Sequence, residues 1–181
     1  MDRPRLTFPT FTVKTILTHT ATYFLVGWLA YTFWSHVSLP GGGGPYPVIR
    51  PVSDPLVMAA SALQIIRGLL FSIVFYLLRE SLFHRKNGGL VLWLTLVVLG
   101  ILGTFAPASG SLEGMFFTYQ PLLGHLYGLA EILLQSLFLS LILFYWVNHP
   151  QKKWLNWVMG VVYFIAVGLP LLNLIANISP R

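Results

Sequence analysis

Five mostly apolar stretches, each about 18 to 25 residues long, constrain this 181-residue chain more than any other feature. They cover residues 12–34, 55–78, 89–106, 123–147 and 154–176. An α-helix rises about 1.5 Å per residue, so about 20 apolar residues cross the hydrocarbon core of a bilayer. We therefore expect an all-α polytopic membrane protein, with five transmembrane helices bundled into a single domain over residues 1–181. Proline lacks a backbone N–H, so we expect Pro170 to break the last stretch near its external end.

Charged residues make up only 9% of the chain, whereas soluble proteins carry about 25%. This scarcity excludes a soluble enzyme, a disordered tail and a nucleic-acid-binding module. The chain contains no Cys, which excludes disulfides, thiolate metal sites and a thiol nucleophile. The expected location is the cell membrane. The expected partners are the lipid bilayer and other membrane protein subunits or a second copy of the chain, with no nucleic acid.

The distribution of Lys and Arg predicts how the chain is oriented. Basic residues gather before the first stretch or at its start, after the second, and after the fourth: Arg3, Arg5, Lys14, Arg79, Arg85, Lys86, Lys152 and Lys153. The opposite ends of the stretches carry only Arg50 and Arg181. The positive-inside rule then predicts a cytoplasmic N-terminus and an external C-terminus. The first stretch exceeds the apolar core of about 7–15 residues found in signal peptides, so we expect a retained anchor.

Arg67 and Glu131 lie deep inside two of the apolar stretches, the second and the fourth. A charge at the bilayer centre costs about 2.5–3.5 kcal/mol on insertion scales, so each needs a partner. On the fourth stretch, Glu131 and Gln135 share a helix face with two glycines in G-x-x-x-G spacing. On the second stretch, Gln64 and Arg67 flank a stripe of small residues. We expect these two stretches to pack along these faces, with Gln64, Arg67, Glu131 and Gln135 satisfying one another.

Two interpretations of this four-residue cluster stay open. It is either a buried ion pair with amide support that fixes how the helices dock, or a site that binds a polar ligand or relays protons. Buried pairs are often about neutral for stability, so the docking role does not by itself require strong stabilisation. An Arg67→Leu variant that stays stable but loses an assigned activity would exclude the docking-only interpretation.

Three further residues are secondary candidates. His19 is expected to be a hydrogen-bonding core residue rather than a ligand, because no second His lies at a matching depth. Glu113 is expected to cap the segment that follows it or to bind a partner. His125, with Ser109, Ser111 and Glu113, supplies the residue types of a hydrolytic triad, yet no G-x-S-x-G motif accompanies them. We expect no metal, haem or other cofactor.

The sequence favours an accessory, assembly or interaction subunit of the membrane, without catalytic chemistry of its own. The first alternative is a small oligomeric transporter or ligand-binding permease that uses the midplane Arg/Glu/Gln cluster. The second is an enzyme that modifies lipid or isoprenoid substrates, with Glu131 or His125 as acid and base. No P-loop, H-E-x-x-H motif or dinucleotide-binding motif is present.

Overall fold

The computed structural model describes residues 6–34, 55–105 and 107–178, and the regular structure of this part of the chain is entirely helical. The elements are α1 (Phe8–Trp34), α2 (Pro55–Leu77), α3 (Arg79–Leu82), α4 (Gly88–Val97), the π-helix η1 (Val98–Leu102), α5 (Leu112–Phe117), α6 (Leu122–Asn148), α7 (Trp154–Tyr163), the π-helix η2 (Phe164–Gly168) and α8 (Leu169–Ile178). Four of the basic residues on which the predicted orientation depends lie outside the described residues: Arg3, Arg5, Arg50 and Arg181.

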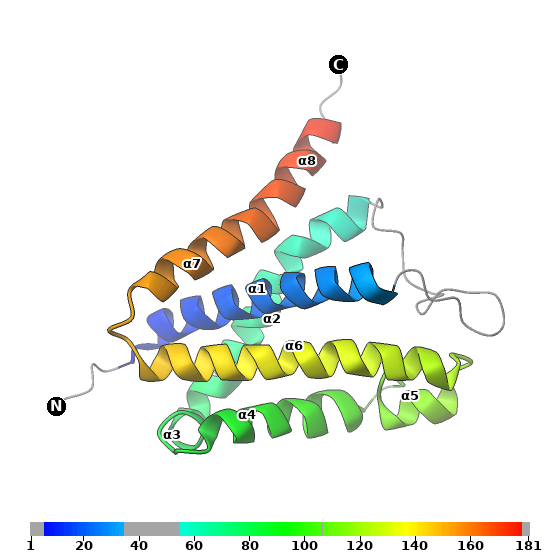
Figure 1. Ribbon diagram of the computed structural model, residues 1–181, viewed down its shortest axis with the longest axis horizontal. Helices are drawn as coiled ribbons and strands as arrows, with labels where there is room; N and C mark the ends of the chain where they lie inside the picture. The colour runs from blue at the N-terminus through cyan, green and yellow to red at the C-terminus, as the bar shows by residue number, and fades with distance from the viewer. Residues whose placement is uncertain (1–5, 35–54, 106, 179–181) are drawn as a thin grey trace.

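Helix α1 occupies the centre of the bundle and packs against α2, α6 and α7. Helix α6 lies between α1 and α4 and runs in the opposite direction to both (Figure 1). The α7–η2–α8 segment diverges from α6, crosses α1 and ends against α2. The main apolar core lies where α2 ends and α4 begins, and its buried members are Phe11, Phe75, Leu82, Phe83, Leu92 and Leu143.

Each of the five apolar stretches is helical, as predicted. By length and composition, two helices of the described chain are long and apolar enough to cross a membrane, Leu122–Asn148 and Trp154–Ala176. The apolar helices Leu63–Leu77 and Gly88–Leu102 are shorter. Helix α1 has 27 residues but is not apolar enough. A membrane location has weak support from the two helices, and five crossings stay a prediction.

The third helical segment ends at Leu102, before the expected boundary at residue 106. The Gly103 N–H donates to the Val98 carbonyl at 2.9 Å, an i→i−5 bond that closes a π-turn. Gly103 itself leaves the helical conformation, with φ −99° and ψ 29°. The α4–η1 segment is therefore shorter than predicted.

The expectation that Pro170 breaks the last helix is wrong. Pro170 is the second residue of α8, and α8 directly follows η2. A proline removes one i→i−4 hydrogen bond and its ring displaces a carbonyl of the preceding turn. A π-turn widens the helix locally, which lets the chain rearrange its hydrogen bonds and continue.

The second and fourth stretches do not form the helix pair that the small-residue faces predicted. Within the described part of the chain, α2 and α6 each pack mainly on α1. Gly68 of α2 faces Ile16 of α1 so closely that a Cβ on Gly68 would lie 2.8 Å from the Ile16 Cα. The small-residue face of α2 therefore accommodates the backbone of α1. The predicted pair was wrong because the pattern of a helix that is apolar on all sides does not specify which neighbour it packs on.

Candidate functional site

A cavity of about 140 Å³ lies between α1, α2, the α4–η1 segment and α6. Its polar lining residues come from three helices and are His19, Arg67, Gln135 and Ser136. The rest of the wall is apolar or glycine: Phe71, Leu96, Gly100, Ile101, Ile132 and Leu139. Such a mixture of an apolar wall and a few polar groups is typical of small-molecule sites.

His19 is the most buried polar residue of the cavity, with 1% of its surface exposed. Its Nε2 lies 3.0 Å from the Gln64 Oε1, and its ring packs edge-on against Phe71 at 5.1 Å. Because a carbonyl oxygen only accepts, Nε2 must carry the proton that it donates to Gln64. The other nitrogen, Nδ1, is buried and has no hydrogen-bond partner among the described residues. The structure thus joins two residues that the sequence had placed in separate groups of candidates.

Arg67 lines the cavity but is itself exposed, which places it where the cavity opens. Its guanidinium lies over the Phe71 ring at 5.8 Å, a cation–π contact. Two ion pairs of the described residues join Glu80 to Arg79 and His84, and neither involves Arg67. Glu131, the partner expected for Arg67, makes an interaction of its own, and a contact between the two stays a prediction.

Helix α6 contributes the amide and the hydroxyl of the cavity. Gln135 is half-buried, and Ser136 donates to the Leu133 carbonyl at 3.0 Å while its oxygen remains able to accept. Glu131 lies one turn earlier, half-buried, makes an interaction of its own and does not line the cavity. Of the four predicted cluster residues, Arg67 and Gln135 line the cavity and Gln64 supports it through His19.

Lys14 has a role that the sequence did not reveal. It is buried, and its Nζ donates to the Trp146 carbonyl at 3.1 Å and lies 5.3 Å from the centre of the Trp146 ring. Trp146 is in the last turn of α6, where carbonyls have no partner within the helix and a positive charge is favourable. The Trp146 indole in turn donates to Asn156 of α7 at 3.0 Å. A lysine at the third residue of an apolar stretch was the available signal, although sequence alone did not identify its acceptor.

His125 anchors a loop and is not placed as an acid or base. The Gly110 N–H donates to its Nδ1 at 3.1 Å, so the proton of the neutral ring lies on Nε2. Nε2 lies 3.1 Å from the Thr118 hydroxyl, which itself donates a hydrogen bond to the Gly114 carbonyl at 2.7 Å. Both ring nitrogens are therefore used to hold residues 110–118 against α6.

Glu113 does not cap the segment that follows it. Ser111 is the N-cap of α5, and its side chain accepts from the Gly114 N–H at 2.9 Å. Glu113 is exposed in the first turn of α5, where a negative charge favours the helix dipole. Ser109 accepts a hydrogen bond from the Gln120 amide at 3.0 Å, so Ser109 and Ser111 stabilise the turn and the start of α5.

The described residues contain no group of three or more His, Asp or Glu that could hold a metal ion. No family model, curated protein or solved structure matches this chain. The fold and the cavity define an all-helical bundle with polar groups inside and an apolar exterior. That arrangement can bind a small polar molecule or dock against another protein.

Proposed function

We propose that this chain is a multi-pass membrane protein whose five helical segments α1, α2, α4–η1, α6 and α7–α8 each cross the bilayer. The support is the distribution of side chains on α2. Its Leu63, Leu70 and Leu77 are 58%, 59% and 75% exposed, whereas Gln64 and Ser72 are buried. Exposure of each of these leucines to water would lose the about 1.5–3 kcal/mol that burying its side chain contributes. Hydrocarbon around the leucines removes this cost.

Helix α1 supports the same proposal from its polar side. Thr15 and Thr22 are buried, and their hydroxyls donate to the carbonyls of Phe11 and Thr18 one turn earlier, at 2.9 Å each. Hydroxyls that bond within their own helix are compatible with a bilayer, where no water is present to satisfy them. Its apolar residues Leu25, Trp28 and Phe33 face outward.

The proposed orientation is a cytoplasmic N-terminus and an external C-terminus. In Figure 1, α1, α4 and α7 begin, and α2 and α6 end, toward the same side of the molecule. The described basic loop residues follow α2 or precede α7 on that side: Arg79, Arg85, Lys86, Lys152 and Lys153. Labelling of an engineered Cys at Gln151 from outside intact cells would contradict this orientation.

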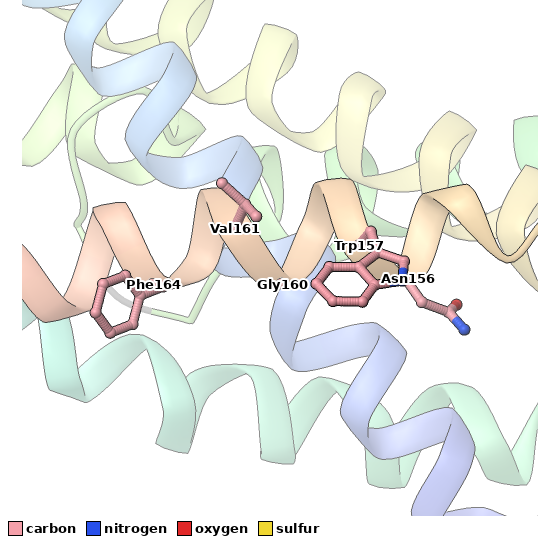
Figure 2. Close-up of a pocket in the computed structure, with 5 residues that line it drawn as sticks. All are labelled: Asn156, Trp157, Gly160, Val161 and Phe164. Carbon is pink, nitrogen blue, oxygen red and sulfur yellow. The ribbon is translucent and has the colours of Figure 1, made fainter.

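Within the cell membrane, we propose that the chain acts as an interaction subunit that docks a transmembrane helix of another protein on α7 and η2. The observation that carries this is a shallow hollow of about 330 Å³ around Gly160. Figure 2 shows the side chains of Trp157 and Phe164 on the two sides of this glycine along the helix. Both are largely exposed, at 78% and 65%.

Gly160 argues for a protein helix rather than lipid as the occupant. No atom of the described residues lies within 4 Å of a Cβ built on Gly160, so the packing of this part of the chain does not require glycine there. Glycine inside a helix costs about 0.5–1 kcal/mol relative to alanine. In membranes, glycine between larger residues allows the backbone of a second helix to approach closely, which a flexible acyl chain does not need.

A photoreactive residue at Val161, in native membranes, tests the docking surface. We expect a discrete protein adduct from this position, and none when the same residue replaces Leu70 on α2. Gly160→Leu fills the hollow and is expected to abolish the adduct without lowering thermal stability, whereas Gly27→Leu, at another open glycine, leaves it unchanged. Adducts to lipid alone would refute docking, and adducts to a second copy would make the occupant this chain itself.

A ligand-binding or permease role is the second candidate function. The cavity between α1, α2, α4–η1 and α6 favours it, because polar groups converge there inside an otherwise apolar bundle.

A further inference from the structure

We propose that the cavity between α1, α2, α4–η1 and α6 binds a small hydroxycarboxylate with a short alkyl chain. This inference names the ligand class for the second candidate function and does not depend on the α7 docking surface. It rests on three features of the cavity: a cation, an unsatisfied hydrogen-bond acceptor and an apolar wall.

The cation is Arg67, which calls for a negatively charged ligand group. Its guanidinium takes no part in the ion pairs of Glu80 and lies over the Phe71 ring, and a cation within a bilayer is costly without an anion beside it. A carboxylate matches the planar donor geometry of arginine and is bound through two parallel hydrogen bonds. The Gln135 amide, which also lines the cavity, adds a neutral donor for the same group.

The acceptor is the Nδ1 of His19. Because Nε2 donates to Gln64, Nδ1 carries a lone pair and needs a donor. In the described part of the chain this buried nitrogen has no hydrogen-bond partner, and His19 lines the cavity. A plain carboxylate or a halide ion has no proton to donate, whereas a hydroxyl beside the carboxylate does.

The apolar wall sets the rest of the ligand. Phe71, Ile101, Ile132 and Leu139 offer no hydrogen bond, so the remainder of the molecule is expected to be alkyl. A volume of about 140 Å³ is close to that of engineered cavities that hold one benzene molecule, about 150 Å³. A hydroxyacid of about four carbons therefore fits, and a sugar or nucleotide does not.

The test measures binding of three probes to the purified full chain in nanodiscs by calorimetry: 2-hydroxybutyrate, butyrate and 1,2-butanediol. We expect 2-hydroxybutyrate to bind most tightly, butyrate at least about tenfold more weakly because it cannot donate to His19, and the uncharged diol weakest. Equal binding of all three would show a cavity that binds ligands but would refute the proposed class. Binding of none would refute both the class and the ligand-binding function.

Two variants assign the recognition to residues. Arg67→Gln should weaken 2-hydroxybutyrate binding about ten- to hundredfold, whereas Arg79→Gln, the same change outside the cavity, should not. His19→Phe should remove the preference for 2-hydroxybutyrate over butyrate while butyrate binding persists. A preference that survives in His19→Phe would overturn the role of Nδ1. If Arg67→Gln does not fold, the comparison of the three probes on the unmodified chain decides the proposal.

Discussion

Gly68→Ala is the most direct probe of how α1 and α2 pack. A Cβ at this position would lie 2.8 Å from the Ile16 Cα and 3.1 Å from the Ile16 Cγ1. The nearer atom belongs to the backbone, so no side-chain rotation relieves the contact and the two helices must separate. Forcing an extra carbon into packed helices costs about 1–3 kcal/mol.

The magnitude follows from comparison with a matched glycine. Gly27→Ala on α1 meets nothing within 4 Å, so it changes only helix propensity, which favours alanine by about 0.5–1 kcal/mol. Both variants gain this term, and their difference isolates the clash of about 1–3 kcal/mol. In a chain of this size, 1 kcal/mol shifts Tm by about 2–4 °C, so Gly68→Ala should melt about 2–12 °C below Gly27→Ala.

The assay is thermal unfolding of both variants in the same detergent at one heating rate, followed by intrinsic tryptophan fluorescence. Ile16→Ala should not rescue Gly68→Ala, because the Ile16 Cα remains in place. Equal melting temperatures for the two glycine variants would refute the close approach of α1 and α2.

Two further predictions concern residues whose roles emerged from the structure. Lys14→Met removes the hydrogen bond to the Trp146 carbonyl and the cation–π contact while keeping most of the side-chain length, and should destabilise the bundle by about 1.5–3 kcal/mol, measured by denaturant unfolding. Lys152→Met, an exposed counterpart, should stay within about 0.5 kcal/mol, and equal effects would contradict the buried role of Lys14. His125→Phe leaves the Gly110 N–H without its acceptor and should speed amide hydrogen exchange in residues 110–118 without changing exchange in α1. Unchanged exchange in that loop would show that His125 does not anchor it.

The positions of the helices were predictable because each apolar stretch is long and bounded by Pro, Gly or basic residues. The end of the third segment and the interior of the last were less predictable, since η1 and η2 are π-helical turns whose hydrogen bonds do not follow from composition. Pro170 illustrates this: its missing N–H predicts a break, yet the π-turn before it lets the helix continue.

The pairing of helices was not predictable from the sequence. Small residues on α2 and α6 indicated that each helix has a face for close packing, but not which neighbour fills that face. Gly68 accommodates the backbone at Ile16 of α1. The candidate site changed for the same reason: with α1 at the centre, His19 contacts Gln64 and lines the cavity together with Arg67 and Gln135.

Helix α1 has a low hydropathy for a membrane span, and its place at the centre of the bundle explains how it fits that proposed role. Thr15, Thr18, His19 and Thr22 make it too polar to qualify by composition, yet all four are buried against neighbouring helices. One face of α1 is buried against neighbouring helices while Leu25, Trp28 and Phe33 face outward, so the polar groups on its inner face need partners within the protein. Most find them in their own helix or in Gln64. Among the described residues, the Thr18 Oγ1, the His19 Nδ1 and the Thr20 Oγ1 are buried without a hydrogen-bond partner. Of these three residues only His19 lines the cavity, which is why the cavity is the place to look for a ligand.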